Sequence, residues 1–268
     1  MAQASGIARR QPGGVLQSHT RSLFHRSTAS HGRRTRARAG GRVTEGALHP
    51  LPATHEPWPG WAGDLVSHAV FDADPREVAP FLLGKLLVSV KDGFTAGGRI
   101  VETEAYLGSD DPGSHAATRG ITPRNATMYG PSGHAYVYFT YGNHHMLNLV
   151  SDRAGEAGGV LIRGIEPLLG LAVMTSRRGG RSGHELTNGP GKLAQALGID
   201  LGDNGIPLNR DRIFVYDAPV VPPRDVAMSG RIGLSAGHDL EYRYYLRGNP
   251  YVSRGRTGPV PGRSARRG

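Results

Sequence analysis

The 268-residue sequence contains no cysteine, which excludes disulfide scaffolds, cysteine-ligated metal sites and thiol nucleophiles. It also has no long apolar run, since the longest stretches, such as 167–174, are far shorter than the ~18 residues of a membrane helix. Its 40 glycines follow no triplet period, so the chain is not collagen-like. What remains is a chain long enough to bury a sizeable core in one or two domains.

Acidic residues are fewer than basic ones, and the formal net charge is +10, which suggests a polyanionic partner. The excess lies at the ends. Residues 1–60 hold nine Arg and two Glu, and residues 251–268 hold five Arg and no acid, so the middle of the chain is close to −2. Any function of that middle must therefore rest on particular residues rather than on bulk charge.

The composition predicts three regions: a disordered basic extension over 1–60, an ordered domain over 61–253 and a disordered basic tail over 254–268. The extension is poor in acids and rich in Arg and Ser. That composition is typical of an organellar transit peptide, of a solvated DNA-associating tail, or of residues added by an upstream start codon.

Strands are predicted where β-branched and aromatic residues gather, at 86–90, 98–106, 135–141, 146–151, 159–163, 213–216 and 242–246. Helices are predicted to begin at Asp74-Pro75 and at Glu166-Pro167, the second reaching about Met174, and to cover Lys192–Leu197. Several strands are adjacent in sequence, so we predict a mixed α/β (α+β) single domain rather than a doubly wound fold.

Two acidic residues on one predicted strand are the first candidates for chemistry. Glu102, Glu104 and Tyr106 share a strand face because side chains alternate. Two carboxylates on one face suit a general base if something positive separates them. The alternative is an edge strand with solvated acids.

The turn sequence Asp110-Asp111-Pro112-Gly113 delivers His115 and exposed backbone N–H groups to one place. Asp110, Asp111 and His115 could form a metal site. An Asx-type turn with a solvent-facing histidine is the other interpretation.

Tyr136, Tyr138 and Tyr141 lie within six residues, and Tyr136 and Tyr138 share a strand face. Such a cluster fits either nucleobase stacking or a cross-strand aromatic core. The neighbouring His144 and His145 face opposite ways on a strand, so they are poorly placed to ligate one ion.

Asn148 and Arg163 each interrupt an apolar run. Buried amides need hydrogen-bond partners, and a buried arginine is almost always paired with a carboxylate. We therefore predict that Glu104, Arg163 and Asn148 converge on one pocket.

These segments, in this order, resemble the alkyladenine (3-methyladenine) DNA glycosylase family over about residues 65–253. The motifs that carry the resemblance are Glu102-Thr103-Glu104-Ala105-Tyr106, His115, Thr122-Pro123-Arg124-Asn125, Tyr136-Val137-Tyr138, Tyr141-Gly142, Asn148, Val160-Leu161-Ile162-Arg163, Asn188-Gly189-Pro190-Gly191-Lys192-Leu193, Arg231-Ile232-Gly233-Leu234-Ser235 and Arg247-Gly248-Asn249-Pro250-Tyr251-Val252-Ser253. The resemblance implies a compact domain with a curved, mainly antiparallel sheet and surrounding helices. It also implies excision of alkylated or deaminated purines from duplex DNA, so that 61–253 would be the catalytic domain.

The resemblance further implies roles for individual residues. Glu104 would activate the attacking water, with Arg163 holding that water and the carboxylate. Three rings would stack on the flipped base, those of Tyr106, His115 and Tyr138.

Three further residues receive roles from the same resemblance. Tyr141 would fill the gap left in the duplex. Asn148 would exclude guanine by crowding its exocyclic amine, and Lys192 would contact a phosphate.

Neither a metal nor an organic cofactor is expected. No lysine lies on these strand segments, so a Schiff-base lyase step has no obvious amine and a monofunctional enzyme is predicted. We expect a monomer that acts on double-stranded DNA containing damaged purines, without a membrane. We expect it in the bacterial cytoplasm at the nucleoid, with organellar targeting as the alternative.

Two other functions compete with this one. The first is a non-catalytic nucleic-acid-binding module. The second is a metal hydrolase that uses His115, His134, His144 or His145, although the chain has no HExxH or similar metal spacing.

Overall fold

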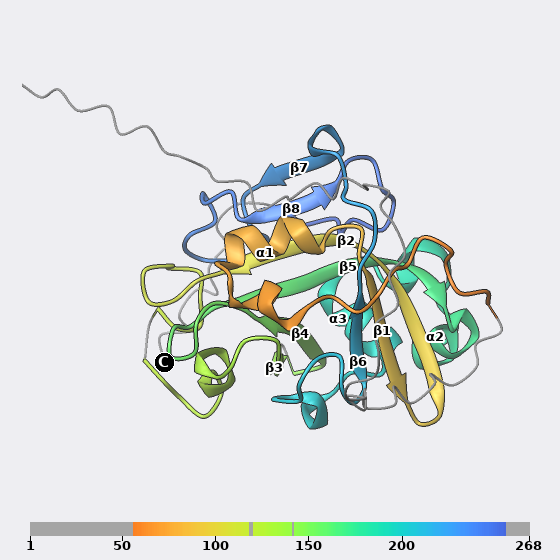
Figure 1. Ribbon diagram of the computed structural model, residues 1–268, viewed down its shortest axis with the longest axis horizontal. Helices are drawn as coiled ribbons and strands as arrows, with labels where there is room; N and C mark the ends of the chain where they lie inside the picture. The colour runs from red at the N-terminus through yellow and green to blue at the C-terminus, as the bar shows by residue number, and fades with distance from the viewer. Residues whose placement is uncertain (1–55, 118–119, 141, 256–268) are drawn as a thin grey trace, which may run out of the picture. The chain divides into compact units, whose positions relative to one another are not determined.

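The computed structural model describes residues 56–117, 120–140 and 142–255. The α-helices of this part are α1 (Pro75–Leu82), α2 (Leu171–Arg177) and α3 (Pro190–Leu197). The strands are β1 (Leu86–Lys91), β2 (Phe94–Tyr106), β3 (Ala135–Thr140), β4 (His144–Val150), β5 (Gly159–Leu169), β6 (Ile213–Tyr216), β7 (Val226–Ser229) and β8 (Arg243–Leu246). Figure 1 shows them in chain order by colour.

The strands of the described residues form one curled antiparallel sheet in the order β3-β4-β5-β2-β1-β6, to which β8 and β7 are added beside β2 (Figure 1). The central strand β2 pairs with β5 along most of its length, with β1 near its start and with β8 over Glu102–Glu104. The helices α1 and α3 pack on this sheet. The predicted α+β class with a curved, mainly antiparallel sheet is confirmed.

Irregular pairing between β2 and β5 occurs where the acidic residues lie. Ile100 pairs with Ile165, Glu102 with Gly164 and Thr103 with Ile162. This register leaves one unopposed residue on each strand, Val101 on β2 and Arg163 on β5. Because β-bulges redirect side chains and twist strands locally, they bring Arg163 against the carboxylates of β2.

The predicted start of α1 is confirmed. The carboxylate of Asp74 accepts a hydrogen bond from the backbone N–H of Arg76 at 2.7 Å, and Pro75 occupies the first helical turn. Asp74 satisfies one of the free N–H groups of the helix end, and Pro75 has none to satisfy. The buried face of α1, with Val78 and Leu82, joins the main hydrophobic core beside the sheet.

The predicted helix from Glu166-Pro167 is wrong at its start. Strand β5 continues through both residues to Leu169, and α2 begins at Leu171, after Gly170 adopts a left-handed φ of 70°. Pro167 stays in the strand because it pairs with Gly98, where the ladder shifts register, and an irregular site tolerates a residue without an N–H. The proline marked a bulge rather than a helix start.

Several predictions fall outside the described residues. Tyr141 does, and so do residues 1–55 of the predicted extension and 256–268 of the predicted tail. In the part that is described, no helix has the length and apolar character needed to cross a bilayer.

Candidate active site

A pocket of about 310 Å³ opens where β2, β3, β4 and β5 meet two loops. Most of the residues that the sequence singled out line it together: Tyr106, His115, Tyr138, Asn148 and Arg163. Further lining residues are Tyr136, Met128, Met146, Pro190 and the loop 232–234. The predicted convergence of distant polar groups on one pocket is therefore confirmed for Arg163 and Asn148.

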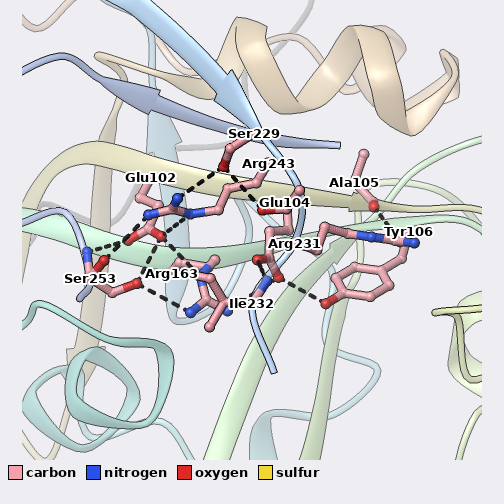
Figure 2. A network of polar contacts seen from close by, with 11 residues as sticks. Glu102, Glu104, Ala105, Tyr106, Arg163, Ser229, Arg231, Ile232, Arg243 and Ser253 are labelled. Atoms are coloured by element: carbon pink, nitrogen blue, oxygen red, sulfur yellow. Dashed lines mark hydrogen bonds and ion pairs between the residues drawn. The ribbon is translucent and has the colours of Figure 1, made fainter. Parts of the chain in front are cut away.

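Glu104 lies fully buried beside this pocket and is held by three donors among the described residues (Figure 2). The Tyr106 hydroxyl donates to Oε2 at 2.8 Å and Arg163 Nη1 donates to the same oxygen at 3.2 Å. The backbone N–H of Ile232 donates to Oε1 at 2.8 Å. A carboxylate has about four acceptor positions, so these bonds leave Oε1 able to accept one more proton donor, such as water.

Glu102 is equally buried and accepts four hydrogen bonds from the protein, one more than Glu104. Oε1 accepts from Arg163 Nε, Arg243 Nε and the Ser253 hydroxyl at 3.0, 2.7 and 2.8 Å, and Oε2 accepts from the Ser253 N–H at 2.6 Å. The solvated-edge alternative for this pair of acids is wrong, since both carboxylates are buried. Of the two, Glu104 has fewer protein donors and is the one that bonds a pocket-lining ring, that of Tyr106.

The negative charges of Glu104 and Glu102 influence the pKa values of the groups that bond them. Burial lowers the pKa of Arg163, but the charges of Glu104 and Glu102 outweigh this and raise it above its usual value. Burial, followed by the charge of Glu104, raises the pKa of Tyr106 well above its usual value. Arg163 therefore stays a cation and Tyr106 stays a neutral hydrogen-bond donor.

His115 lies at the pocket wall, where its Nδ1 is 3.1 Å from the Tyr136 hydroxyl and its ring meets that of Tyr138 edge-on at 4.6 Å. Its backbone carbonyl accepts a bond from Asn125 at 3.0 Å. Burial, with the nearby charge of Arg124, lowers the pKa of His115. A base between His115 and Tyr138 requires this edge contact to open, and the predicted stacking on three rings stays a prediction.

The turn before His115 is an Asx turn, as one of the two interpretations held: Asp111 Oδ1 accepts from the N–H of Gly113 at 2.9 Å. Asp111 is buried, however, and forms two bonds with the fully buried Arg231, at 2.6 and 2.5 Å. Arg231 also lies over the Tyr106 ring at 4.7 Å. The metal interpretation of this turn gains no support, because Arg231 bonds both carboxylate oxygens of Asp111.

The amide of Asn148 donates to the Tyr136 carbonyl at 3.2 Å, which fixes its orientation toward the pocket. Lys192 is placed differently from the other predicted residues. Its ammonium group bonds Glu185 and Asn188, both at 2.8 Å, so a phosphate would have to share this cation with Glu185.

No cluster of three His, Asp or Glu side chains suited to a metal ion occurs in the described ranges. Three of the four histidines proposed for such a site have other neighbours: His134 bonds the Ser132 carbonyl, His145 packs on Phe139, and His144 lies against Gly191. The metal-hydrolase alternative gains no support from this arrangement.

Sequence reasoning did not identify Arg231, Arg243, Ser253 and the Ile232 N–H as parts of the site. Together with Glu102, Glu104, Asp111 and Arg163 they form one buried network of three carboxylates and three guanidinium groups (Figure 2 shows most of it). The rule that buried arginines pair with carboxylates applied to Arg243 as well, since it lies in a predicted strand. Arg231 and Ser253 stand in motifs of the family resemblance, which assigned them no role.

The described residues thus form an antiparallel α+β domain in which a pocket lined by aromatic rings lies next to a buried network of carboxylates and guanidinium groups, an arrangement suited to holding a flat ring beside an acidic group. A model of the family described as methylpurine-DNA glycosylase (MPG) matches residues 69–250. The chain belongs to this family, and it is therefore a DNA glycosylase, a DNA-repair hydrolase of N-glycosyl bonds.

Similar proteins bear this out. The chain is 46% identical over 185 residues to a protein of Chlorobaculum tepidum named "Putative 3-methyladenine DNA glycosylase". The matched region covers 69% of this chain and 88% of the relative. Proteins of the same name match from Burkholderia cenocepacia, with 47% identity over 78% of this chain and 97% of the relative, and from Carboxydothermus hydrogenoformans, with 46% identity over 71% and 99%.

Proposed function

We propose that this enzyme flips alkylated or deaminated purines, 3-methyladenine among them, out of duplex DNA and hydrolyses their N-glycosyl bond with a water activated by Glu104. The observation that carries the proposal is the buried Glu104 carboxylate, which has three protein donors and one acceptor position left on Oε1, and which bonds Tyr106 and Arg163 of the aromatic pocket. A base stacked inside a duplex has to be extruded before such a group can reach its sugar.

The pocket suits a purine in several ways. Aromatic faces stabilise an extruded base by about 1–3 kcal/mol each, and Tyr106, His115 and Tyr138 supply such faces. A purine alkylated on its ring carries positive charge, which adds a cation–π attraction to the tyrosine rings. Asn148 presents an amide to the pocket and would crowd the exocyclic amine of guanine.

At the reacting carbon, Glu104 does two things. Bond cleavage builds positive charge on the sugar, which the carboxylate stabilises, while its oxygen takes a proton from the attacking water. Arg163, which lines the pocket and bonds Glu104, holds the carboxylate and the water in place.

We further propose that the product is an abasic site, without strand cleavage. A lyase step needs a free amine at the sugar, and none of the pocket-lining residues is a lysine. The three lysines of the chain are engaged elsewhere: Lys85 with Asp217, Lys91 with Asp200 and Lys192 with Glu185.

Release of free base from duplex DNA tests the proposed function. We expect the protein to release 3-methyladenine from alkylated duplex DNA, or hypoxanthine from a duplex with one such base, at the same rate with and without EDTA. Chromatography detects the free base, and gel electrophoresis with and without alkali detects the abasic site.

Each alternative outcome has a distinct meaning. Binding without base release would favour the non-catalytic module. Loss of release in EDTA would favour a metal hydrolase, and strand cleavage without alkali would contradict the monofunctional assignment.

The protonation of His115 should set how well charged bases are accepted. The pKa of His115 lies below its usual value of about 6.5, so the ring is neutral at pH 7. The ring gains a proton only as the pH falls through this lowered pKa. A protonated ring repels a cationic alkylated purine but not neutral hypoxanthine. We expect the ratio of 3-methyladenine to hypoxanthine release to fall in this acidic range, and His115→Phe to remove the fall. An equal fall in the variant would contradict this role.

A further inference from the structure

Ser253 lies in the segment that follows β8 and inserts itself behind the pocket, next to Arg163 and Glu102 (Figure 2). It is 9% exposed, and all of its polar groups are used. Its N–H donates to Glu102 at 2.6 Å and its carbonyl accepts from Arg243 Nη2 at 3.3 Å. The main chain of this segment is thus bonded to the acidic strand β2 at Glu102 and to β8 at Arg243.

The Ser253 hydroxyl acts as donor and acceptor at once. It donates to Glu102 Oε1 at 2.8 Å and accepts from Arg163 Nη2 at 3.2 Å. A hydroxyl group can do both, because it has one proton to donate and two lone pairs that accept. The hydroxyl therefore links the carboxylate of Glu102 to the guanidinium of Arg163, which lines the pocket.

Arg163 has one described partner for each of its three nitrogen atoms. Nε bonds Glu102 at 3.0 Å, Nη1 bonds Glu104 at 3.2 Å and Nη2 bonds Ser253 at 3.2 Å. Three anchors fix the plane of a guanidinium, whereas two leave it free to rotate about the line that joins them. The Ser253 bond to Nη2 thus fixes the plane of the guanidinium and, with it, the directions of the N–H groups on Nη1, which bonds Glu104.

Gly164, the residue after Arg163, allows the segment to lie this close. A Cβ at this position would come within 2.6 Å of the Tyr251 carbonyl, a distance that real Cβ atoms do not reach. The approach of the segment to β5 therefore depends on a missing side chain. This close approach places the Ser253 hydroxyl within hydrogen-bond distance of the Arg163 guanidinium.

We propose that Ser253 is a positioning residue for the reaction, which orients Arg163 and through it Glu104 and the attacking water. The inference rests on the function proposed above. Ser253 touches no reacting atom, so its loss should slow the chemical step and leave binding of the extruded nucleotide unchanged.

The test compares Ser253→Ala with Ser253→Thr in the full chain. In single-turnover release of hypoxanthine from a duplex, we expect Ser253→Ala to be slower by about 10-fold, the scale of a small misplacement in a catalytic constellation. Its affinity for a duplex that holds an uncleavable abasic analogue should equal that of the wild type. Ser253→Thr keeps the hydroxyl and should restore the rate.

Thr103→Val is the matched control, since Thr103 is a buried hydroxyl residue of β2 that bonds the Ala79 carbonyl of α1 at 2.9 Å, away from the network. It should lower the melting temperature without changing the rate. Gly164→Ala, which displaces the segment that carries Ser253, should also slow single-turnover release without changing duplex affinity. It replaces Ser253→Ala in the test if Ser253→Ala does not fold.

Three outcomes would overturn the inference. A wild-type rate in Ser253→Ala would do so while leaving the proposed function intact, and so would equal slowing in Ser253→Ala and Ser253→Thr. A wild-type protein that releases no base would remove the proposed function and this inference together.

Discussion

Glu104→Gln is expected to abolish base release while leaving the fold and the binding of damaged DNA intact. Glutamine has nearly the same shape and keeps one acceptor for the three donors around it, but it takes no proton from water and carries no charge to stabilise the sugar cation. General-base catalysis alone contributes about 10²–10⁴-fold to the rate of a reaction. The single-turnover rate should therefore fall by a factor of at least about 10².

The measurement is single-turnover release of hypoxanthine, followed by chromatography, with duplex affinity measured in parallel. Glu102→Gln is an informative comparison, because Glu102 is equally buried but is held by four protein donors rather than three. Full activity in Glu104→Gln would disprove the catalytic assignment. If Glu102→Gln proved the more damaging change to the rate at equal stability, the roles of the two carboxylates would have to be exchanged.

Asp111→Ala should give the largest loss of stability of any single change discussed for this protein. The substitution leaves the guanidinium of Arg231, which is fully buried, without its carboxylate. Breaking a buried ion pair from one side costs about 3–5 kcal/mol, because the remaining charge is desolvated and uncompensated. It also removes the acceptor for the N–H groups of Leu107 and Gly113 and so releases the loop that carries His115.

Chemical denaturation measures this change in the free energy of unfolding. The neighbouring Asp110→Ala is the matched control, since Asp110 is exposed and should change stability little. The double variant Asp111→Ala/Arg231→Met should be more stable than Asp111→Ala, because it removes the uncompensated charge. Equal stability of the two single aspartate variants would contradict the buried pair.

Much of the fold could be predicted because its signals are local. The strand of residues 213–216 coincides with β6, and the helix start at Asp74-Pro75 rests on a cap formed within three residues. The error at Glu166-Pro167 has a non-local cause. Proline marks both helix starts and strand irregularities, and only the register against Gly98 distinguishes them here.

The candidate site also has a part that local sequence signals predict and a part that only non-local contacts decide. Alternation along β2 correctly placed Glu102 and Glu104 on one side, because both bond Arg163. It left open which of them acts, since that depends on how many donors reach each carboxylate. Those donors come from segments about 60 to 150 residues away in sequence, at Arg163, Ile232 and Ser253.

The net charge of +10 illustrates the limit of composition. The charged ends of the sequence account for it, while the pocket rests on a buried network in which three carboxylates balance three guanidinium groups. Placement rather than total charge therefore prepares this protein for its substrate.

By itself, the sequence determined which residues are available, the α+β class and, through the order of its motifs, the family resemblance that the comparisons confirmed. Only the tertiary structure decided that Glu102 has four protein donors, that Glu104 has three and retains an acceptor position on Oε1, and that Ser253 bonds Arg163. The physical reason is that periodicity tells which face of a strand a side chain occupies, whereas the number of hydrogen bonds to a buried group depends on the segments that the fold brings against that face.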